Sequence, residues 1–400
     1  MGMRMSQATD LEGVRQRAPR IFLVAAEPSG DALAGDLIDA LRALRPNVEI
    51  AGVGGPEMAR RGAVSPFDIS ELSVFGLFDG LKIINLVHQR AQETAEAAKA
   101  FEADAVVLID SWGFMLRAAW KLREALPDTP LIKYVAPQVF AARRERAKVA
   151  AETFDHLLAI HPFDAPYFTE HGMDVTFVGN PALERDLSGD GPAFRARHDV
   201  AKTDQLLLVL FGSRKSELTR LFPRFADAVN RLKAERPGLR IVTPLAPSIA
   251  TQAREMISAE PAFADLIIVD SDERRDAFHA ADTALACSGT VTLELARLGV
   301  PTVAAYRLGW LAWAAARFFL MKSKYISLAN IAADEMLIPE HVQTQCRGDV
   351  LAESVGALLD APDRRKALSD RLRSITDHMR GAGGSPSRNA AQAVLNITGR

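Results

Sequence analysis

The sequence predicts an α/β protein of two doubly wound domains, and three observations lead to this class. The chain has 400 residues, more than a single hydrophobic core usually organises, and 48% of them are apolar. Short runs of β-branched residues or leucine alternate with helical patterns, which is typical of a parallel sheet covered on both faces. The alternation starts again after residue 205. We therefore expect two sheets, each with its own core.

Apolar runs mark the expected strands. The first set comprises residues 21–26, 105–109, 131–135, 157–160 and 175–178, with a further short run at 48–51. The second set comprises residues 206–211, 241–243, 266–269, 283–286 and 302–306. Turn-forming residues at 179–181 and 188–192 separate the sets as the expected linker. The expected boundaries are a flexible tail at 1–20, a first domain at 21–183 and a second domain at 184–384.

One helical pattern follows the first strand of each domain. The earlier one begins near residues 29–31 and has leucines on one face, at Leu33, Leu37, Leu41 and Leu44. The later one covers residues 218–232 with the same period, although Pro223 should break or kink it.

Composition excludes several classes of protein. Lys and Arg total 48 against 50 for Asp and Glu, so no overall positive field attracts nucleic acid. Two cysteines are too few for a disulfide framework, and no cluster of His, Cys or carboxylates has metal-ligand spacing. Residues 1–20 lack the apolar segment of a secretory signal. We therefore expect a cytoplasmic protein without a metal or other cofactor.

Ligands of open α/β sheets bind beyond the carboxyl ends of the strands, where helix N-termini offer free N–H groups. The turn after the first strand contains Glu27, Ser29, Gly30 and Asp31. It either admits a sugar or phosphate close to the backbone or simply starts a helix, and the pattern favours neither. Gly55 belongs to a glycine cluster for which an ordinary tight turn is the favoured interpretation.

Asp110 ends the strongly apolar run 105–109, which puts a carboxylate at the ligand-binding edge of the first sheet. A partly desolvated carboxylate there can take a proton from a substrate hydroxyl. The alternative is a helix N-cap, which the residues alone favour.

A strand followed by a cation-bearing helix start is a candidate diphosphate site. In the second domain the run 206–211 leads into Gly212, Ser213 and Arg214. Arg214 can donate two parallel hydrogen bonds to phosphate oxygens, whereas the neighbouring Lys215 can equally be a solvated surface charge.

Small residues also separate a strand from a helix at Ser288, Gly289 and Thr290. Backbone N–H groups in such a turn can hold phosphate. Glu294, one helical turn later, can accept hydrogen bonds from a ribose or can act only on the helix N-terminus.

Two apolar segments are candidates for contact with lipid. Residues 308–321 contain Trp310 and Trp313 and are too short to span a bilayer, and residues 75–87 begin at Phe75. Each segment alone is more often a core helix, but two of them favour a lipid-facing patch. The remaining alternative is a homodimer interface.

The chain resembles the lipid-A-disaccharide synthase family, and the match runs in order over nearly the whole chain after the tail. The motifs that carry the resemblance are Ala26-Glu27-Pro28-Ser29-Gly30-Asp31, Gly54-Gly55-Pro56-Glu57-Met58, Tyr134-Val135-Ala136-Pro137-Gln138-Val139-Phe140, Pro162-Phe163-Asp164, Val178-Gly179-Asn180-Pro181, Gly212-Ser213-Arg214-Lys215-Ser216-Glu217, Ser288-Gly289-Thr290, Tyr325-Ile326-Ser327-Leu328-Ala329-Asn330, and Pro339-Glu340 with Gln343.

The resemblance implies a GT-B glycosyltransferase of two Rossmann-like domains facing a cleft, with a C-terminal helix at 385–400 that returns to the first domain. It implies a donor, UDP-2,3-diacylglucosamine, an acceptor, 2,3-diacylglucosamine 1-phosphate, and peripheral association with the inner face of the cytoplasmic membrane. Asp110 would be the general base. The implied acceptor-binding residues are Glu27, Ser29, Gly30, Asp31 and Gly55. The implied UDP-binding residues are Gly212, Ser213, Arg214, Ser288, Gly289, Thr290, Glu294, Asn330 and Gln343.

One departure from the family pattern concerns the catalytic motif. Relatives often carry a second carboxylate where this chain has Gly113, so Asp110 is the only carboxylate left in that motif. This leaves two alternatives open. One is a different UDP-sugar transferase or a UDP-N-acetylglucosamine 2-epimerase of the same architecture, and the other is a catalytically silent lipid- or nucleotide-binding regulator.

Overall fold

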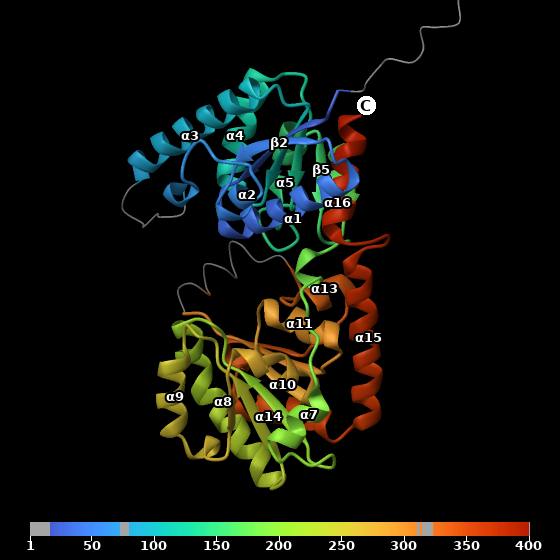
Figure 1. The fold of residues 1–400 in the computed structure, drawn as a ribbon. Coiled ribbons are helices and arrows are strands. Elements are labelled where there is room, and N and C mark those ends of the chain that lie inside the picture. Colours follow the sequence, from blue (N-terminus) through green and yellow to red (C-terminus); the bar gives the residue numbers. More distant parts are fainter. Residues whose placement is uncertain (1–16, 73–79, 310–312, 314–322, 400) are drawn as a thin grey trace, which may run out of the picture.

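A computed structural model describes residues 17–72, 80–309, 313 and 323–399. Twelve strands in these ranges form two six-stranded sheets, and every strand pair is parallel. The first sheet has the order β2-β1-β3-β4-β5-β6, and the second has the order β12-β11-β10-β7-β8-β9. Figure 1 shows the two sheets in separate layered bodies along the chain.

The strands of the first sheet are β1 (Arg20–Ala25), β2 (Glu49–Val53), β3 (Ala105–Ile109), β4 (Leu131–Tyr134), β5 (His156–Ala159) and β6 (Asp174–Phe177). Those of the second are β7 (Leu206–Leu210), β8 (Arg240–Pro244), β9 (Ile267–Val269), β10 (Thr283–Cys287), β11 (Thr302–Tyr306) and β12 (Glu340–Val342).

The helices of the first body are α1 (Pro28–Leu44), α2 (Pro56–Arg60), α3 (Gly80–Ala100), α4 (Trp112–Ala125), α5 (Glu145–Thr153) and α6 (Ala165–Thr169). The helices after them are α7 (Gly191–Arg197), α8 (Lys215–Glu235), α9 (Ala250–Ser258), α10 (Arg274–Ala280), α11 (Thr290–Leu298), α13 (Leu328–Ala333), α14 (Gly348–Leu359), α15 (Pro362–Arg380) and α16 (Pro386–Thr398).

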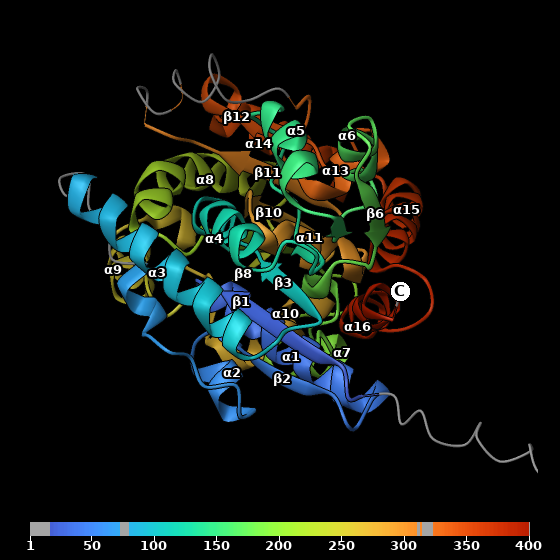
Figure 2. The ribbon, with the colours of Figure 1, turned by 90° about the horizontal axis from the view of Figure 1, so that it is seen from above.

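Alternate residues of the central strands build a core on each face of each sheet. In β1, Phe22 and Val24 belong to one hydrophobic cluster, whereas Ile21 and Leu23 belong to the cluster on the other face. Helices α3 and α4 lie side by side over the first of these faces (Figure 2). Because both faces are covered, the strands consist of continuous apolar runs, and this is why the sequence reveals them.

The last helix packs against the first domain. Ala390, Ala391 and Val394 of α16 belong to the same buried cluster as Leu37 and Ile38 of α1, and Figure 1 shows the two helices side by side. The fold thus brings together segments from opposite ends of the chain.

Two chain segments pass between the sheets next to each other. The Asn180 N–H donates to the carbonyl of Met379 at 2.9 Å, and Asn389 Nδ2 donates to the carbonyl of Val178 at 3.0 Å. Gly179 has a φ of +96°, and a Cβ there would lie 2.0 Å from the Arg380 carbonyl oxygen. Only glycine fits this close approach.

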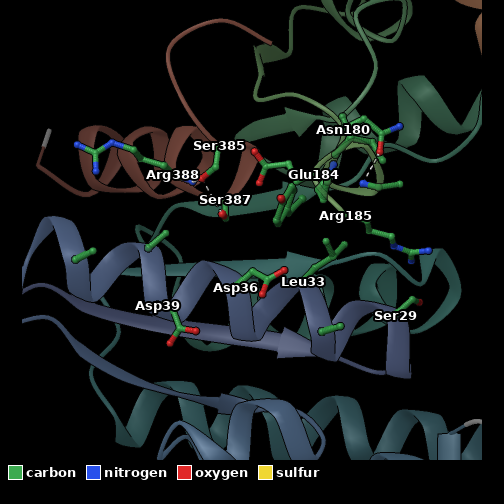
Figure 3. A pocket seen from close by; sticks show the side chains of 17 residues that line it. Ser29, Leu33, Asp36, Asp39, Asn180, Glu184, Arg185, Ser385, Ser387 and Arg388 are labelled. Atoms are coloured by element: carbon green, nitrogen blue, oxygen red, sulfur yellow. Dashed lines mark hydrogen bonds between the residues drawn. The ribbon is translucent and has the colours of Figure 1, made fainter. Parts of the chain in front are cut away.

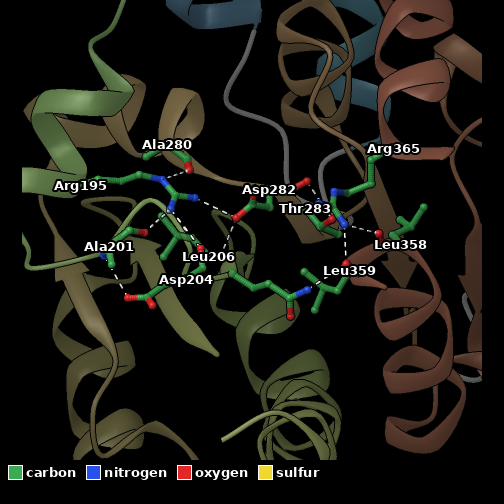
Figure 4. A network of polar contacts seen from close by, with 11 residues as sticks. Arg195, Ala201, Asp204, Leu206, Ala280, Asp282, Thr283, Leu358, Leu359 and Arg365 are labelled. Atoms are coloured by element: carbon green, nitrogen blue, oxygen red, sulfur yellow. Dashed lines mark hydrogen bonds and ion pairs between the residues drawn. The ribbon is translucent and has the colours of Figure 1, made fainter. Parts of the chain in front are cut away.

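A polar network stabilises the second sheet at the amino ends of β7 and β10 (Figure 4). Arg195 Nη2 donates to Asp282 Oδ2 at 2.8 Å, and the same oxygen accepts from the N–H of Leu206 at 2.8 Å. This network lies at the edge opposite the strand ends where ligands bind, so its role is structural.

Several sequence expectations need correction. Helix α8 runs without a break through Pro223, because its buried face, from Leu218 to Leu232, outweighs the missing hydrogen bond. Five expected strands extend one residue too far at the carboxyl end; the run 131–135, for example, ends at Tyr134 because Val135 has a φ of +72°. Strand β12 was not expected, and Arg20 belongs to β1 rather than to the tail.

Candidate functional site

Asp110 lies directly after β3 in a strained turn. Its φ is +57° and that of Ser111 is +29°, both in the left-handed region that non-glycine residues rarely adopt. Asp110 Oδ2 accepts a hydrogen bond from Ser29 Oγ at 3.0 Å. The N-cap of α4 is Ser111, so the helix-cap interpretation of Asp110 is wrong. Strain of this kind is concentrated at functional sites.

Lys133 of β4, which sequence reasoning missed, stabilises this turn through hydrogen bonds to backbone carbonyls. Its Nζ donates to the backbone carbonyls of Asp110 at 2.6 Å, Tyr134 at 3.1 Å and Leu108 at 3.4 Å. Burial lowers the pKa of the Lys133 ammonium to about 7, and the charge of Asp110 opposes that shift. The available signal was a lysine inside an otherwise apolar strand.

A pocket of about 260 Å³ opens beside these residues. Its walls include Asp110, Trp112, Lys133, Gln138, Arg146 and His161. The His161 ring stacks on Phe163 with centroids 4.9 Å apart, and burial lowers its pKa to about 4. His161 is therefore neutral near pH 7, and it adds no charge to the pocket.

Residues of the turn after β1 have two different roles: Ser29 contacts Asp110, whereas Gly30 and Asp31 position the neighbouring helices. The Asp31 carboxylate accepts from the N–H groups of Gly55 at 2.8 Å, Glu57 at 2.8 Å and Met58 at 3.1 Å, which anchors the start of α2. A Cβ on Gly30 would lie 3.3 Å from the carbonyl oxygen of Ile109, so glycine lets α1 approach β3 closely. Ser29 contacts Asp110 itself.

Glu27 is the N-cap of α1 and is exposed, and its side chain makes no capping hydrogen bond. Of the five residues expected to bind acceptor, Ser29 and Glu27 therefore have side chains that remain available, whereas Asp31 and Gly55 are joined to each other.

A larger cavity of about 770 Å³ lies between α1, the segment at 180–185 and the start of α16 (Figure 3). Ser29 lines it at one end, and Ile160 is a wall of both pockets. Burial raises the pKa of Asp36 and of Glu184, which both line this cavity, and the charge of Asp36 also raises the pKa of Glu184. The cavity therefore adjoins the Asp110 pocket and is acidic.

In the second sheet, Gly212, Ser213 and Arg214 form the turn between β7 and α8. Gly212 has a φ of +96°, and a Cβ there would lie 3.2 Å from Cys287 Sγ, so this turn adjoins the one after β10. The Ser213 N–H donates to Glu217 Oε2 at 3.1 Å, and Arg214 Nη1 donates to Glu217 Oε1 at 2.7 Å. Glu217 raises the pKa of Arg214, so its guanidinium stays charged.

Ser288 and Gly289 lie between β10 and α11, Thr290 is the first residue of α11, and no side chain caps that helix. Glu294, which is buried, pairs with Arg274 and lies 3.7 Å from Arg185. Arg185 precedes α7, so Glu294 also connects the second sheet with the segment that leads into it.

Asn330 and Gln343 are buried and hold loops in place. Asn330 exchanges two hydrogen bonds with the backbone of Ile338, at 2.7 and 2.8 Å, and Gln343 does the same with Leu308, at 2.7 and 3.3 Å. Glu340, a second residue that sequence reasoning left without a role, accepts from the N–H groups of Ile326 and Ser327 at 2.9 and 2.6 Å. These three side chains fix the backbone at Leu308, at 326–327 and at Ile338.

Two expectations concern features that the structure describes only in part. Within the described residues, no group of three or more His, Cys, Asp or Glu is placed to hold a metal ion. No described helix has the length and apolar character needed to cross a bilayer. Of the expected lipid-facing segments, residues 75–79, 310–312 and 314–321 lie outside the described residues, Trp310 among them. Residues 80–87 begin α3, where Ile84 is exposed.

Comparison with solved structures defines the class of the fold. MurG of Acinetobacter baumannii has a TM-score of 0.60 at 14% identity and covers 94% of this chain and 99% of its own. A UDP-GlcNAc 2-epimerase from Neisseria meningitidis has a TM-score of 0.57 at 11% identity, with 94% of this chain and 100% of that one covered. With the two parallel sheets, this confirms the predicted GT-B fold.

Sequence comparison then shows the family. The family model described as Lipid-A-disaccharide synthetase matches residues 21–394. Lipid-A-disaccharide synthase of Rhodospirillum centenum is 43% identical over 379 residues, which are 94% of each chain. That of Paramagnetospirillum magneticum is 38% identical over 382 residues, 94% of this chain and 97% of the relative. The chain belongs to the lipid-A-disaccharide synthetase family, which confirms the resemblance.

Proposed function

We propose that this chain is a hexosyltransferase that joins two acylated glucosamines. It transfers the sugar of UDP-2,3-diacylglucosamine to 2,3-diacylglucosamine 1-phosphate, and the products are the β1,6-linked disaccharide 1-phosphate and UDP. The family match over residues 21–394 supports the reaction class. The observation that supports the site best is the hydrogen bond from Ser29 to Asp110 at the wall of a pocket.

In the proposed mechanism the acceptor's 6-hydroxyl oxygen attacks the anomeric carbon of the donor. Its proton passes to the Asp110 carboxylate, and the bond between that carbon and the diphosphate oxygen breaks, so that UDP leaves with inversion. Ser29 positions the carboxylate by donating to Oδ2, which leaves Oδ1 for the hydroxyl.

The leaving diphosphate needs positive charge and hydrogen-bond donors. Arg214, with a side chain that is 76% exposed, supplies the charge, and the turns at 212–213 and 288–290 supply backbone N–H groups. Glu217 holds the first turn in shape before UDP arrives. Glu294 accepts hydrogen bonds from the ribose, for which it exchanges its contact with Arg274.

In this proposal the acceptor and UDP bind to different parts of the chain. Residues 21–183 with the helix at 385–400 bind the acceptor, and residues 184–384 bind UDP. Asn330 and Gln343 act on the nucleotide pocket through the loops that they hold, rather than by direct contact.

The acylated substrates place the enzyme at the inner face of the cytoplasmic membrane as a peripheral protein. The apolar sequence of segments 75–87 and 308–321 supports this, and a homodimer through the same segments is the competing proposal. Flotation with liposomes that contain anionic lipid tests the first, and sedimentation equilibrium tests the second.

Incubation of the purified protein with the two acylated substrates tests the function directly. We expect UDP and the disaccharide phosphate in equal amounts by mass spectrometry. Release of UDP without disaccharide, or conversion of UDP-N-acetylglucosamine to its 2-epimer, would contradict the proposal and favour another enzyme of the same fold.

A further inference from the structure

Arg146 differs from Arg20, Arg61 and Arg90, three other half-buried arginines of the first domain, in having no carboxylate within ion-pair distance among the described residues. Arg61 and Arg90 have side chains that are 23% and 18% exposed, and each forms an ion pair with a carboxylate, at 2.8 and 2.6 Å. Among the described residues, the side chain of Arg146 has neither an ion pair nor a hydrogen bond, and its guanidinium lies 5.5 Å above the ring of Trp112.

The charge of Arg146 is correspondingly unbalanced. Carboxylates raise the pKa of Arg61 and Arg90, whereas burial and the nearby Arg143 lower the pKa of Arg146, against a smaller opposing effect of Glu145. A guanidinium that has lost water without gaining an anion is a cost to the folded protein. Such a group is retained at a site where a ligand supplies the missing charge.

The other residues that line the pocket indicate the kind of ligand that Arg146 would bind. It lines the pocket of about 260 Å³ whose walls also include Asp110, Trp112 and Lys133. Lys133 Nζ is hydrogen-bonded to three backbone carbonyls, so it makes no direct contact with a ligand. Arg146 is therefore the pocket's donor for an anion, and Asp110 is its acceptor for a hydroxyl.

We propose that Arg146 binds the phosphate of the acceptor, so that this pocket is an anion subsite that selects a sugar phosphate over a neutral sugar. The inference rests on the proposed function. A sugar phosphate presents a hydroxyl at one end and a phosphate at the other, which matches a pocket with Asp110 and Arg146 in its walls. The volume is below the about 300–1,000 Å³ of a drug-sized ligand site, so it suits the head group, with the acyl chains outside.

The donor's diphosphate is assigned to a different arginine, Arg214, at the start of α8 in the second domain. The two anions of the reaction thus have separate sites, and a change at Arg146 should act on the acceptor alone. This separation makes the proposal testable apart from the chemistry of transfer.

The closest matched control is Arg144. Its guanidinium lies 5.5 Å above the ring of Tyr167, the same distance as Arg146 above Trp112, but it is exposed and does not line the pocket. Arg144→Ala removes the same charge, two residues away, from the same helix start.

The experiment measures binding of short-chain 2,3-diacylglucosamine, with and without its 1-phosphate, by calorimetry, together with kcat and KM for both acceptors. Wild-type protein should bind the phosphorylated acceptor more tightly. Arg146→Ala should lose about tenfold or more of that affinity and raise its KM, while the Kd for UDP is unchanged. Arg146→Lys should retain part of the preference, and Arg144→Ala should retain all of it.

Equal affinity of the wild type for the two acceptors would overturn the subsite, as would an Arg146→Ala variant that keeps the preference. Both outcomes can be read from binding alone. A wild-type protein that shows the preference but forms no disaccharide would contradict the proposed function and leave the subsite standing.

Discussion

Ser29 Oγ donates to Asp110 Oδ2 at 3.0 Å across 81 residues of sequence, and this contact joins the start of α1 to the end of β3. The contact exists because β1 and β3 are neighbours in the sheet, with Ala25 paired with Ile109. Gly30 permits it, because a side chain there would crowd the backbone of Ile109.

Asp110→Asn should lower turnover by at least about 100-fold, the usual effect of losing a general base. The variant keeps the size of the side chain and should bind UDP as the wild type does. Asp128→Asn is the control, since Asp128 is an exposed residue of the turn before β4, and this variant should be fully active. Near-normal turnover of Asp110→Asn, measured by UDP release, would exclude this carboxylate as the base.

Arg214→Ala should weaken UDP binding by about 1.5–3 kcal/mol, or roughly 10- to 150-fold in Kd, because it removes a charged hydrogen-bond donor. Arg231→Ala is the matched control, since Arg231 is also exposed and also pairs with a carboxylate on α8, that of Asp227 at 2.9 Å. Calorimetric titration with UDP measures both. If the two variants bind equally well, the diphosphate lies elsewhere.

Lys133 should make stability depend on pH above neutrality. Its pKa is about 7 in the folded protein against a usual value of 10.5, so between these values the unfolded chain binds a proton that the folded protein does not. The free energy of unfolding should therefore rise with pH across this window, by at most about 1.4 kcal/mol per pH unit from this group.

Lys133→Met removes the titrating group and also three hydrogen bonds, so its overall stability should be lower. The informative quantity is the slope of unfolding free energy against pH from 7 to 10, from urea titrations, which should be smaller in the variant. Identical slopes for wild type and variant would show that Lys133 keeps its proton throughout.

Gly179→Ala should destabilise the protein more than Gly172→Ala, although both glycines have positive φ, +96° and +79°. The shared cost of a left-handed alanine is about 1–2 kcal/mol. A Cβ at Gly179 also meets the Arg380 carbonyl at 2.0 Å, whereas nothing lies within 4 Å at Gly172. We expect an additional loss of about 1–3 kcal/mol at Gly179, measured by thermal unfolding. Equal losses would mean that the two crossing segments separate at no cost.

The apolar runs allowed prediction of the two-sheet architecture, because strands buried on both faces must be continuously hydrophobic. Strand β12 escaped prediction because all three of its residues are partly exposed and two of them, Glu340 and His341, are polar. The expected break at Pro223 is absent, because burial of the long apolar face of α8 stabilises the helix by more than the proline destabilises it.

The candidate site was predicted in part. Asp110 and Arg214 were identified as candidate site residues because each follows an apolar run, and the end of such a run is visible in the local sequence. The same reasoning could not separate ligand-binding side chains from supporting ones in the first turn. Asp31 anchors α2, whereas Ser29 contacts Asp110, and this depends on which way each side chain points.

The sequence by itself determined the class, the family and the strand ends that bear the candidate residues, since each of these is written in contiguous motifs and in the period of apolar residues. Only the tertiary structure decided that Lys133 lies beneath Asp110 and that Arg146 lines the same pocket without an ion pair. The physical reason is that burial and pairing arise between residues distant along the chain, and no local pattern encodes which of them meet.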